Sequence, residues 1–264
     1  MLTIASFNVN SLRVRMPHLT AWLKSAAPDV VLLQEIKCLD QELPRMEIES
    51  LGYKVSAVGQ KARHGVALLS RVPYKVELTA LPGDETDVQA RYLEALIEAP
   101  APHDRPVRVA SIYLPNGNPI DTEKFPYKLR WMERLNRHAR DLLAREEIVV
   151  LGGDYNVCPT DEDVFDTVAM ADDALCQPET RRRFRELANL GYVDALRAFF
   201  PAGRHYTFWD YQNARWDRDE GLRIDHLMLS PQAADLLDAV GIDKEPRKLD
   251  RPSDHTPIWV RLAN

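Results

Sequence analysis

Hydrophobic positions recur along the chain in short runs, and most of these runs have the length of a β-strand. Apolar runs of about four to eight residues that end in polar or turn residues are typical of buried strands. The runs that predict strands are Leu2–Phe7, Val30–Leu33, Val66–Ser70, Tyr92–Ile97, Val107–Tyr113, Ile148–Leu151, Ile224–Leu229 and Ile258–Leu262. They are spread over the whole chain, so we expect a single α/β domain over residues 1–264.

Two helical patterns lie between these strands. From about Glu123 to Arg145, apolar side chains recur at spacings of three and four, which places them on one face of a helix. The apolar face carries Phe125, Leu129, Met132, Leu135, Ala139 and Leu143, and the other face carries Lys124, Lys128, Arg130, Arg134, Arg137 and Arg140. A second helix is predicted over Glu179–Leu190, before Gly191, because glycine commonly follows the last helical residue. Prolines at 100, 102 and 106 predict a surface loop.

The composition is that of a globular protein. Hydrophobic residues make up 45% of the chain and charged residues 28%, which excludes a disordered chain and a collagen-like repeat. The formal net charge of −6 argues against a protein that binds nucleic acid by electrostatics alone. It does not exclude a nucleic-acid enzyme, because carboxylates that hold a divalent cation count as negative in the sequence.

The first residues of the chain, its apolar runs and its cysteines indicate where in the cell the protein is expected. The first residues lack the basic segment and long apolar segment of a signal peptide, and no run approaches the ~18 apolar residues of a membrane span. Cys38, Cys158 and Cys176 are odd in number and have no C-x-x-C spacing, so we interpret them as reduced thiols. We therefore expect a cytoplasmic protein without a membrane partner.

Polar side chains that can carry chemistry lie where the predicted strands end. The segments are Asn8-Val9-Asn10, Gln34-Glu35-Ile36-Lys37, Tyr113-Leu114-Pro115-Asn116-Gly117, Gly152-Gly153-Asp154-Tyr155-Asn156, Arg223-Ile224-Asp225-His226 and Ser253-Asp254-His255-Thr256-Pro257. Taken singly, most of them are ordinary turns or strand ends. Asp225 is less ordinary, because a carboxylate within an apolar strand is costly to bury without a partner. Together, such groups in a shared space would form a site for a hard cation beside a general base.

In this order, the six segments resemble the signature of the endonuclease/exonuclease/phosphatase superfamily, and within it the exonuclease III family of apurinic/apyrimidinic endonucleases. The resemblance covers the chain from Ile4 to Val260. It implies a four-layer α/β sandwich, with two mixed sheets packed face to face and flanked by helices. It also implies a monomeric, Mg²⁺-dependent enzyme, in which Mn²⁺ can substitute. The implied substrate is double-stranded DNA with abasic sites or with blocked or recessed 3′ ends. Cleavage 5′ to the lesion, 3′→5′ exonuclease and 3′-end cleaning are the implied activities.

The resemblance also implies roles for individual residues. Glu35 matches the main metal ligand, Asp154 the residue that orients and deprotonates the attacking water, and Asn156 a residue that holds that water or a phosphate oxygen. His255 would donate a hydrogen bond to the scissile phosphate, with Asp225 as its orienting partner. The residues implied around the metal are Asn8, Glu35, Asp154, Asn156, Asp254 and His255. Tyr113 would contact the phosphate and Asn116 would position the DNA backbone.

A pocket for the abasic sugar is implied at Phe208, Leu222 and Ile224, with Trp209 as support. The alternative is that these four are ordinary core residues. A compact apolar pocket would accept a bare deoxyribose and exclude an intact nucleotide by size.

Two other functions are compatible with parts of the pattern. Another member of the superfamily, such as a phosphoinositide phosphatase, a sphingomyelinase or a nonspecific deoxyribonuclease, shares the Glu, Asp-x-Asn and Asp-His positions. The segments Tyr206–Tyr211 and Gly221–Asp225 are less typical of those enzymes and favour the repair branch. A non-catalytic nucleic-acid-binding homologue would have lost some of these residues, but every motif position here carries the residue that the chemistry needs.

Overall fold

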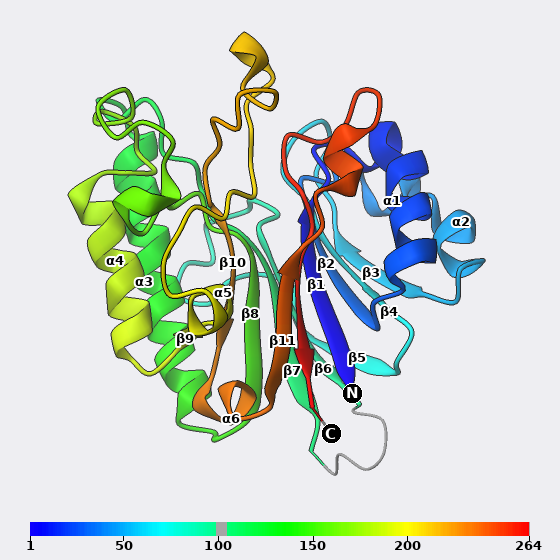
Figure 1. Cartoon of the computed structure of the whole chain (residues 1–264). Helices are drawn as coiled ribbons and strands as arrows, with labels where there is room; N and C mark the ends of the chain where they lie inside the picture. The colour runs from blue at the N-terminus through cyan, green and yellow to red at the C-terminus, as the bar shows by residue number, and fades with distance from the viewer. Residues whose placement is uncertain (99–104, 264) are drawn as a thin grey trace.

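The computed structural model describes residues 1–98 and 105–263, and its strands form two mixed six-stranded sheets that pack face to face (Figure 1). The first sheet has the order β11-β12-β1-β2-β4-β3 and the second the order β5-β6-β7-β8-β10-β9. The strands are β1 Leu2–Asn8, β2 Val30–Gln34, β3 Lys54–Val58, β4 Val66–Ser70, β5 Tyr74–Leu78, β6 Tyr92–Ile97, β7 Val107–Tyr113, β8 Ile148–Asp154, β9 Val193–Asp194, β10 Asp225–Leu229, β11 Leu237–Ile242 and β12 Ile258–Leu262. The helices are α1 Leu12–Ala26, α2 Arg45–Glu49, α3 Lys124–Leu143, α4 Pro178–Asn189, α5 Ala195–Phe199 and α6 Pro231–Ala234. The predicted fold class is confirmed.

All eight predicted strands are present, and the four strands that the pattern did not predict are the edge strands of the two sheets. These are β3, β5, β9 and β11, which are half-buried or partly exposed along most of their length. Central strands such as β2 and β4 are buried at every position. An edge strand needs fewer apolar side chains and often carries charged ones, so its hydrophobic signal is weak.

Successive residues of each strand pack against different layers of the fold. In β1, Leu2 and Ile4 belong to the core between the two sheets, whereas Ala5 and Phe7 pack outward with residues of α1. The outer face of the second sheet packs in the same way against α3 and α4 (Figure 1). Successive side chains of a strand point to opposite faces, so two stacked sheets with helices outside give the four layers.

The two predicted helices, α3 and α4, are present, but the predicted polar face of α3 is partly wrong. Lys128 and Arg134, which the pattern assigns to that face, are buried. Each has polar partners: Lys128 donates to two backbone carbonyls, and Arg134 donates to the Asp87 carboxylate at 2.7 Å. The prolines at 100 and 102 lie outside the described residues. Within the described ranges, every helix is too short or too polar to span a membrane.

The two chain termini lie at one end of the sheets, and the loops that follow β1, β2, β7 and β8 lie at the other (Figure 1). β1 is parallel to β2 in the first sheet, and β7 is parallel to β8 in the second. The carboxyl ends of these two pairs therefore bring the predicted polar segments to one edge of the sandwich.

Candidate active site

Three predicted site residues stand in a row across the second sheet. Asp154 ends β8 and pairs with Tyr113 on β7 and with Asp225 on β10. The glycine before Asp154 is required by close packing, because a Cβ on Gly153 would lie 1.9 Å from the backbone oxygen of Ile112 on β7. The Gly-Gly-Asp segment thus allows β8 to carry its last carboxylate into the space between the sheets.

Asn8, at the end of β1, connects the first sheet to this row. Its side-chain NH₂ donates to Glu35 at 2.8 Å and to Asp154 at 2.9 Å, and its side-chain oxygen accepts from the Asn10 backbone N–H at 3.0 Å. Glu35 follows β2 with a φ of 51°, a left-handed conformation that is uncommon for glutamate. The contacts make Asn8 the residue that orients both carboxylates. Its direct ligation of a metal stays a prediction.

The donor set fits a hard divalent cation. Among the described residues, Glu35, Asp154 and His255 form a group whose potential ligand atoms all lie within 4.8 Å of one another. Burial raises the pKa of Asp154 well above its usual range, and the charges of Asp225 and Glu35 raise it further. A cation between the two carboxylates would offset that repulsion, and Mg²⁺ prefers one or two carboxylates with water in its other positions.

Glu35 is held ionised by its neighbours. Burial opposes ionisation, but the ammonium of Lys37, 2.8 Å away, and the amide of Asn8 outweigh it and lower the pKa of Glu35. Lys37 was not predicted as a site residue, although its place in Gln34-Glu35-Ile36-Lys37 brought it into the motif.

His255 is a charged hydrogen-bond donor in this geometry. Its Nδ1 lies 2.9 and 3.1 Å from the two carboxylate oxygens of Asp225, and its Nε2 lies 3.7 Å from Asp154. Thr207 donates to the same Asp225 carboxylate at 2.6 Å. Burial alone would lower the pKa of His255, but the carboxylates of Asp225 and Asp154 raise it to about 10. Because Asp225 occupies Nδ1, Nε2 is the ring nitrogen left to face a ligand, and the phosphate contact and the metal-ligand role of His255 both stay predictions.

The remaining predicted polar residues surround this centre. Asn156 donates its backbone N–H to Asp154 at 2.9 Å, and its side-chain oxygen accepts from Asn116 at 3.0 Å. The pKa of the Tyr113 phenol is raised by burial and by the charges of Glu35 and Asp154, so the phenol keeps its proton. Asp254 lies at the rim, where its carboxylate accepts from Asn10 at 2.9 Å, and it is not part of the three-residue group.

A pocket of about 220 Å³ with a mixed apolar and charged lining adjoins the site. The Phe208 ring packs edge-on against His255 at 5.0 Å, and Phe208 and Leu222 pair through their backbones. The pocket is lined by Asn116, Phe165, Met170, Asp173, Leu175, Phe208, Asp210, Arg215, Glu220 and Leu222.

Two of the four predicted pocket residues, Phe208 and Leu222, line this space. Ile224 packs behind the wall in the same apolar cluster. Trp209 is fully buried and stacks edge-on against Trp216 at 4.7 Å, away from the pocket. Sequence reasoning missed Phe165, Met170 and Leu175, because they come from an irregular segment with no hydrophobic period.

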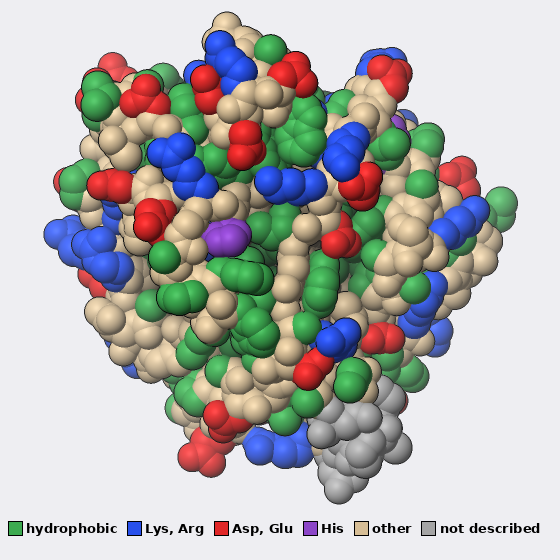
Figure 2. Space-filling view, viewed as in Figure 1, with side chains coloured by type: hydrophobic (Ala, Val, Ile, Leu, Met, Phe, Trp, Pro, Cys, Tyr) green, Lys and Arg blue, Asp and Glu red, His purple; other side chains and the backbone are tan. Residues whose placement is uncertain are grey.

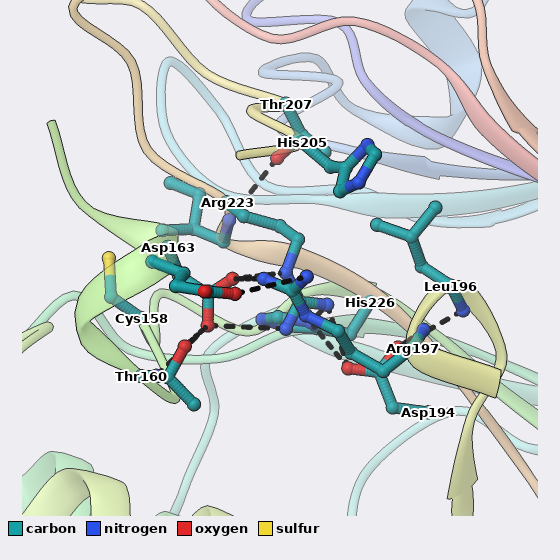
Figure 3. Close-up of polar contacts among 12 residues, drawn as sticks. Cys158, Thr160, Asp163, Asp194, Leu196, Arg197, His205, Thr207, Arg223 and His226 are labelled. Atoms are coloured by element: carbon teal, nitrogen blue, oxygen red, sulfur yellow. Dashed lines mark hydrogen bonds and ion pairs between the residues drawn. The ribbon is translucent and has the colours of Figure 1, made fainter. Parts of the chain in front are cut away.

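A buried ionic network fixes the segment that carries Leu222 and Ile224 and leads into β10 at Asp225 (Figure 3). The guanidinium of Arg223 donates to Asp163 at 2.6 Å and to Asp194 at 2.7 Å, and Arg197 also donates to Asp163 at 2.6 Å. Arg223 and Asp163 are both fully buried. Arg223 lies between Leu222 and Ile224 in the sequence. Because the carboxylates hold its side chain on one side of the backbone, the side chains of Leu222 and Ile224 lie on the other side.

The Asp163→Asn variant should be less stable by about 3–5 kcal/mol at neutral pH, because it removes one of the two carboxylates that compensate the buried Arg223 and breaks a fully buried ion pair. Burial opposes ionisation, but Arg223 holds the pKa of Asp163 well below its usual range. The carboxylate therefore stabilises the fold above its unfolded pKa of about 4, and this contribution is lost as the pH falls below that value.

Urea unfolding at pH 7 and at pH 3 tests this expectation. The difference between wild type and Asp163→Asn should be smaller at pH 3. Asp161→Asn is the matched control, because Asp161 pairs with Arg181 through a side chain that is 74% exposed. Equal losses of stability in both variants would contradict the assignment.

Positive and negative side chains are interspersed on the face seen in Figure 2, including the loops at its upper end. This face therefore offers no broad basic surface, in keeping with the net charge of −6.

Comparisons with known proteins agree with this geometry. The model of the endonuclease/exonuclease/phosphatase family matches residues 5–255. Exodeoxyribonuclease III of Haemophilus influenzae is 34% identical over 269 residues, which cover 97% of this chain and 98% of that protein. Two solved structures are similar over nearly their whole length. One is a variant of a 3′ phosphatase from Neisseria bound to a product DNA hairpin (36% identity, TM-score 0.91, 100% of both chains). The other is an AP endonuclease from Archaeoglobus fulgidus (33% identity, TM-score 0.92, 99% of both chains).

Fold, strand-end residues and these likenesses lead to one conclusion: the chain belongs to the endonuclease/exonuclease/phosphatase family, within the branch of exonuclease III-type nucleases and AP endonucleases.

Proposed function

We propose that the protein is a divalent-cation-dependent DNA-repair phosphodiesterase. It cuts the phosphodiester 5′ to an abasic site and acts on 3′ ends as an exonuclease and end-cleaning enzyme. The observation that carries the proposal is the close grouping of Glu35, Asp154 and His255, with Asp225 behind His255. The names of the similar proteins, which include an exodeoxyribonuclease, a 3′ phosphatase and an AP endonuclease, support the same activities. The proposal includes Mg²⁺ as the cation, with Mn²⁺ able to substitute, a monomeric state and a cytoplasmic location.

Each group at the site has a task in hydrolysing a phosphodiester. Asp154 accepts a proton from the attacking water, for which its raised pKa is favourable. His255 donates from Nε2 to a phosphate oxygen that gains charge in the transition state, while Asp225 holds Nδ1. Glu35 would hold the cation, with Asn8 orienting its carboxylate. When bound, the cation neutralises charge on the phosphate and on the leaving oxygen.

A substrate panel tests the proposed class. The wild-type protein is incubated with an abasic duplex, a duplex with a recessed 3′ end, a 3′-phosphorylated nick, a water-soluble phosphoinositide and sphingomyelin. Turnover should be confined to the DNA substrates and should stop when a chelator removes the divalent cations. Turnover of the phosphoinositide or of sphingomyelin above that of DNA would assign the protein to another branch of the family.

The pocket should select abasic sites by size. We expect Phe208→Ala to weaken discrimination between abasic and intact nucleotides without changing the Mg²⁺ dependence, because Phe208 forms a pocket wall. Leu222→Trp should fill the pocket and depress abasic-site incision more than 3′ trimming. The ratio of kcat/KM values on the two substrates is the measurement. Unfolding of Phe208→Ala, or an equal loss on both substrates, would assign these residues to the scaffold.

A further inference from the structure

Lys128 is a basic residue that the structure buries completely, against the sequence pattern of α3. Its ammonium nitrogen donates to the backbone oxygen of Asn116 at 2.9 Å and to the backbone oxygen of Asn156. Burying a lysine side chain is costly, so a fully buried one needs compensating contacts. Both of its compensating carbonyls belong to residues of the candidate site.

Lys128 joins the two loops that follow β7 and β8. One follows β7 and carries Asn116, and the other follows β8 and carries Asn156. The loops also meet through their side chains: the Asn116 NH₂ donates to the Asn156 side-chain oxygen at 3.0 Å, and the Asn156 NH₂ donates to the Leu114 backbone oxygen at 3.0 Å. These hydrogen bonds connect Lys128, through Asn116 and Asn156, to the Asp154 carboxylate, which accepts from the Asn156 backbone N–H.

The packing leaves little freedom to the lysine side chain. A Cβ on Gly117 would lie 2.7 Å from Cδ of Lys128, so the loop after β7 closes directly on the aliphatic stem. Gly117 also has a φ of 93°, which other residues rarely adopt. Burial lowers the pKa of Lys128 to about 7, while the charges of Asp173 and Asp154 oppose the decrease. Both protonation states keep at least two N–H donors, so either can serve both carbonyls.

We propose that Lys128 is a positioning residue for the phosphodiesterase reaction: from the middle of α3 it holds the backbone of Asn116 and Asn156, so that their side-chain amides face the water and the phosphate beside Asp154. The inference rests on the proposed function. Lys128 itself touches neither substrate nor cation. Its loss would leave two carbonyls without their donor and release the two loops from the helix.

The test compares Lys128→Met with Lys124→Met in the full-length protein. Methionine keeps most of the length of lysine but donates no hydrogen bond, and Lys124 lies exposed one turn earlier on the same helix. On an abasic duplex, we expect Lys128→Met to lower kcat by about 10²-fold, since misplacing catalytic groups by about 1 Å can cost that much. KM for the DNA and Mn²⁺ affinity measured by electron paramagnetic resonance should stay near the wild-type values, and the variant should remain folded under the assay conditions, although its urea midpoint falls because two carbonyls lose their donor. Lys124→Met should match the wild type.

A double-mutant cycle distinguishes positioning from a general structural role. If Lys128 acts through Asn156, then Lys128→Met should add little to the loss in Asn156→Ala, because residues that act as a unit are not additive. Additive losses, a kcat within about threefold of wild type, or a loss of kcat that follows a loss of folded protein would each overturn the proposal. If Lys128→Met does not fold, the test uses Lys128→Arg, which keeps hydrogen-bond donors and must recover both the fold and kcat. A folded but inactive Lys128→Arg also overturns the proposal. Wild-type protein is assayed in parallel. A wild type that does not cut abasic DNA contradicts the proposed function, whereas the comparison of variants with an active wild type concerns only the role of Lys128.

Discussion

We expect Asp154→Asn and His255→Ala each to lower the turnover of abasic DNA by about 10²–10⁴-fold, with DNA affinity largely retained. Asn at position 154 keeps the shape of the side chain but cannot accept the proton of the attacking water. Ala at position 255 removes the Nε2 donor, which lies 3.7 Å from the Asp154 carboxylate and points into the same space. Both groups act mostly in the transition state, so their loss affects kcat more than binding.

Single-turnover rates give the loss of chemistry, and fluorescence anisotropy in the presence of a chelator gives the DNA affinity. Asp225→Asn supplies an internal check, because Asp225 contacts His255 at 2.9 Å and acts through it. The Asp225→Asn and His255→Ala effects should be strongly non-additive. Additive losses in the double variant would show that the two residues do not act as one unit.

The second large effect concerns the cation. We expect Glu35→Ala to shift the Mg²⁺ concentration needed for residual activity far upward, because the variant removes one of the two carboxylates in the group around Asp154. Titration of activity with Mg²⁺ measures the shift. Glu47→Ala, on the exposed surface of α2, is the control and should behave as wild type. An unchanged Mg²⁺ dependence in Glu35→Ala would remove Glu35 from the metal role.

The site could be anticipated from sequence because its residues follow strongly apolar strands. Asn8, Glu35 and Asp154 each end a strand or come directly after one, so the apolar runs of β1, β2 and β8 placed them at or near strand ends, and the family resemblance of the ordered motifs implied that they share one site. Asp225 was informative for the opposite reason, since a carboxylate inside an apolar strand requires a partner, and that partner is His255.

Features that depend on tertiary contacts were not predictable in the same way. The burial of Lys128 and Arg134 contradicts the polar face of α3, because their partners come from loops distant in the sequence. Arg223, between the apolar residues Leu222 and Ile224, carried a signal of burial, but its partner Asp163 lies 60 positions away in an irregular segment. The pocket residues Phe165 and Met170 come from that same irregular region, where no period indicates which side chains turn inward.

Mapping the bond that the wild-type protein cuts in a duplex with one abasic site tests the proposed function most directly. We expect a single cut immediately 5′ to the lesion, leaving a 3′-hydroxyl on one fragment and a 5′ sugar phosphate on the other. The cut should depend on Mg²⁺ and should slow by about 10²–10⁴-fold in Asp154→Asn. A cut on the 3′ side of the lesion, cleavage that persists in a chelator, or cleavage by Asp154→Asn at the wild-type rate would contradict the proposal.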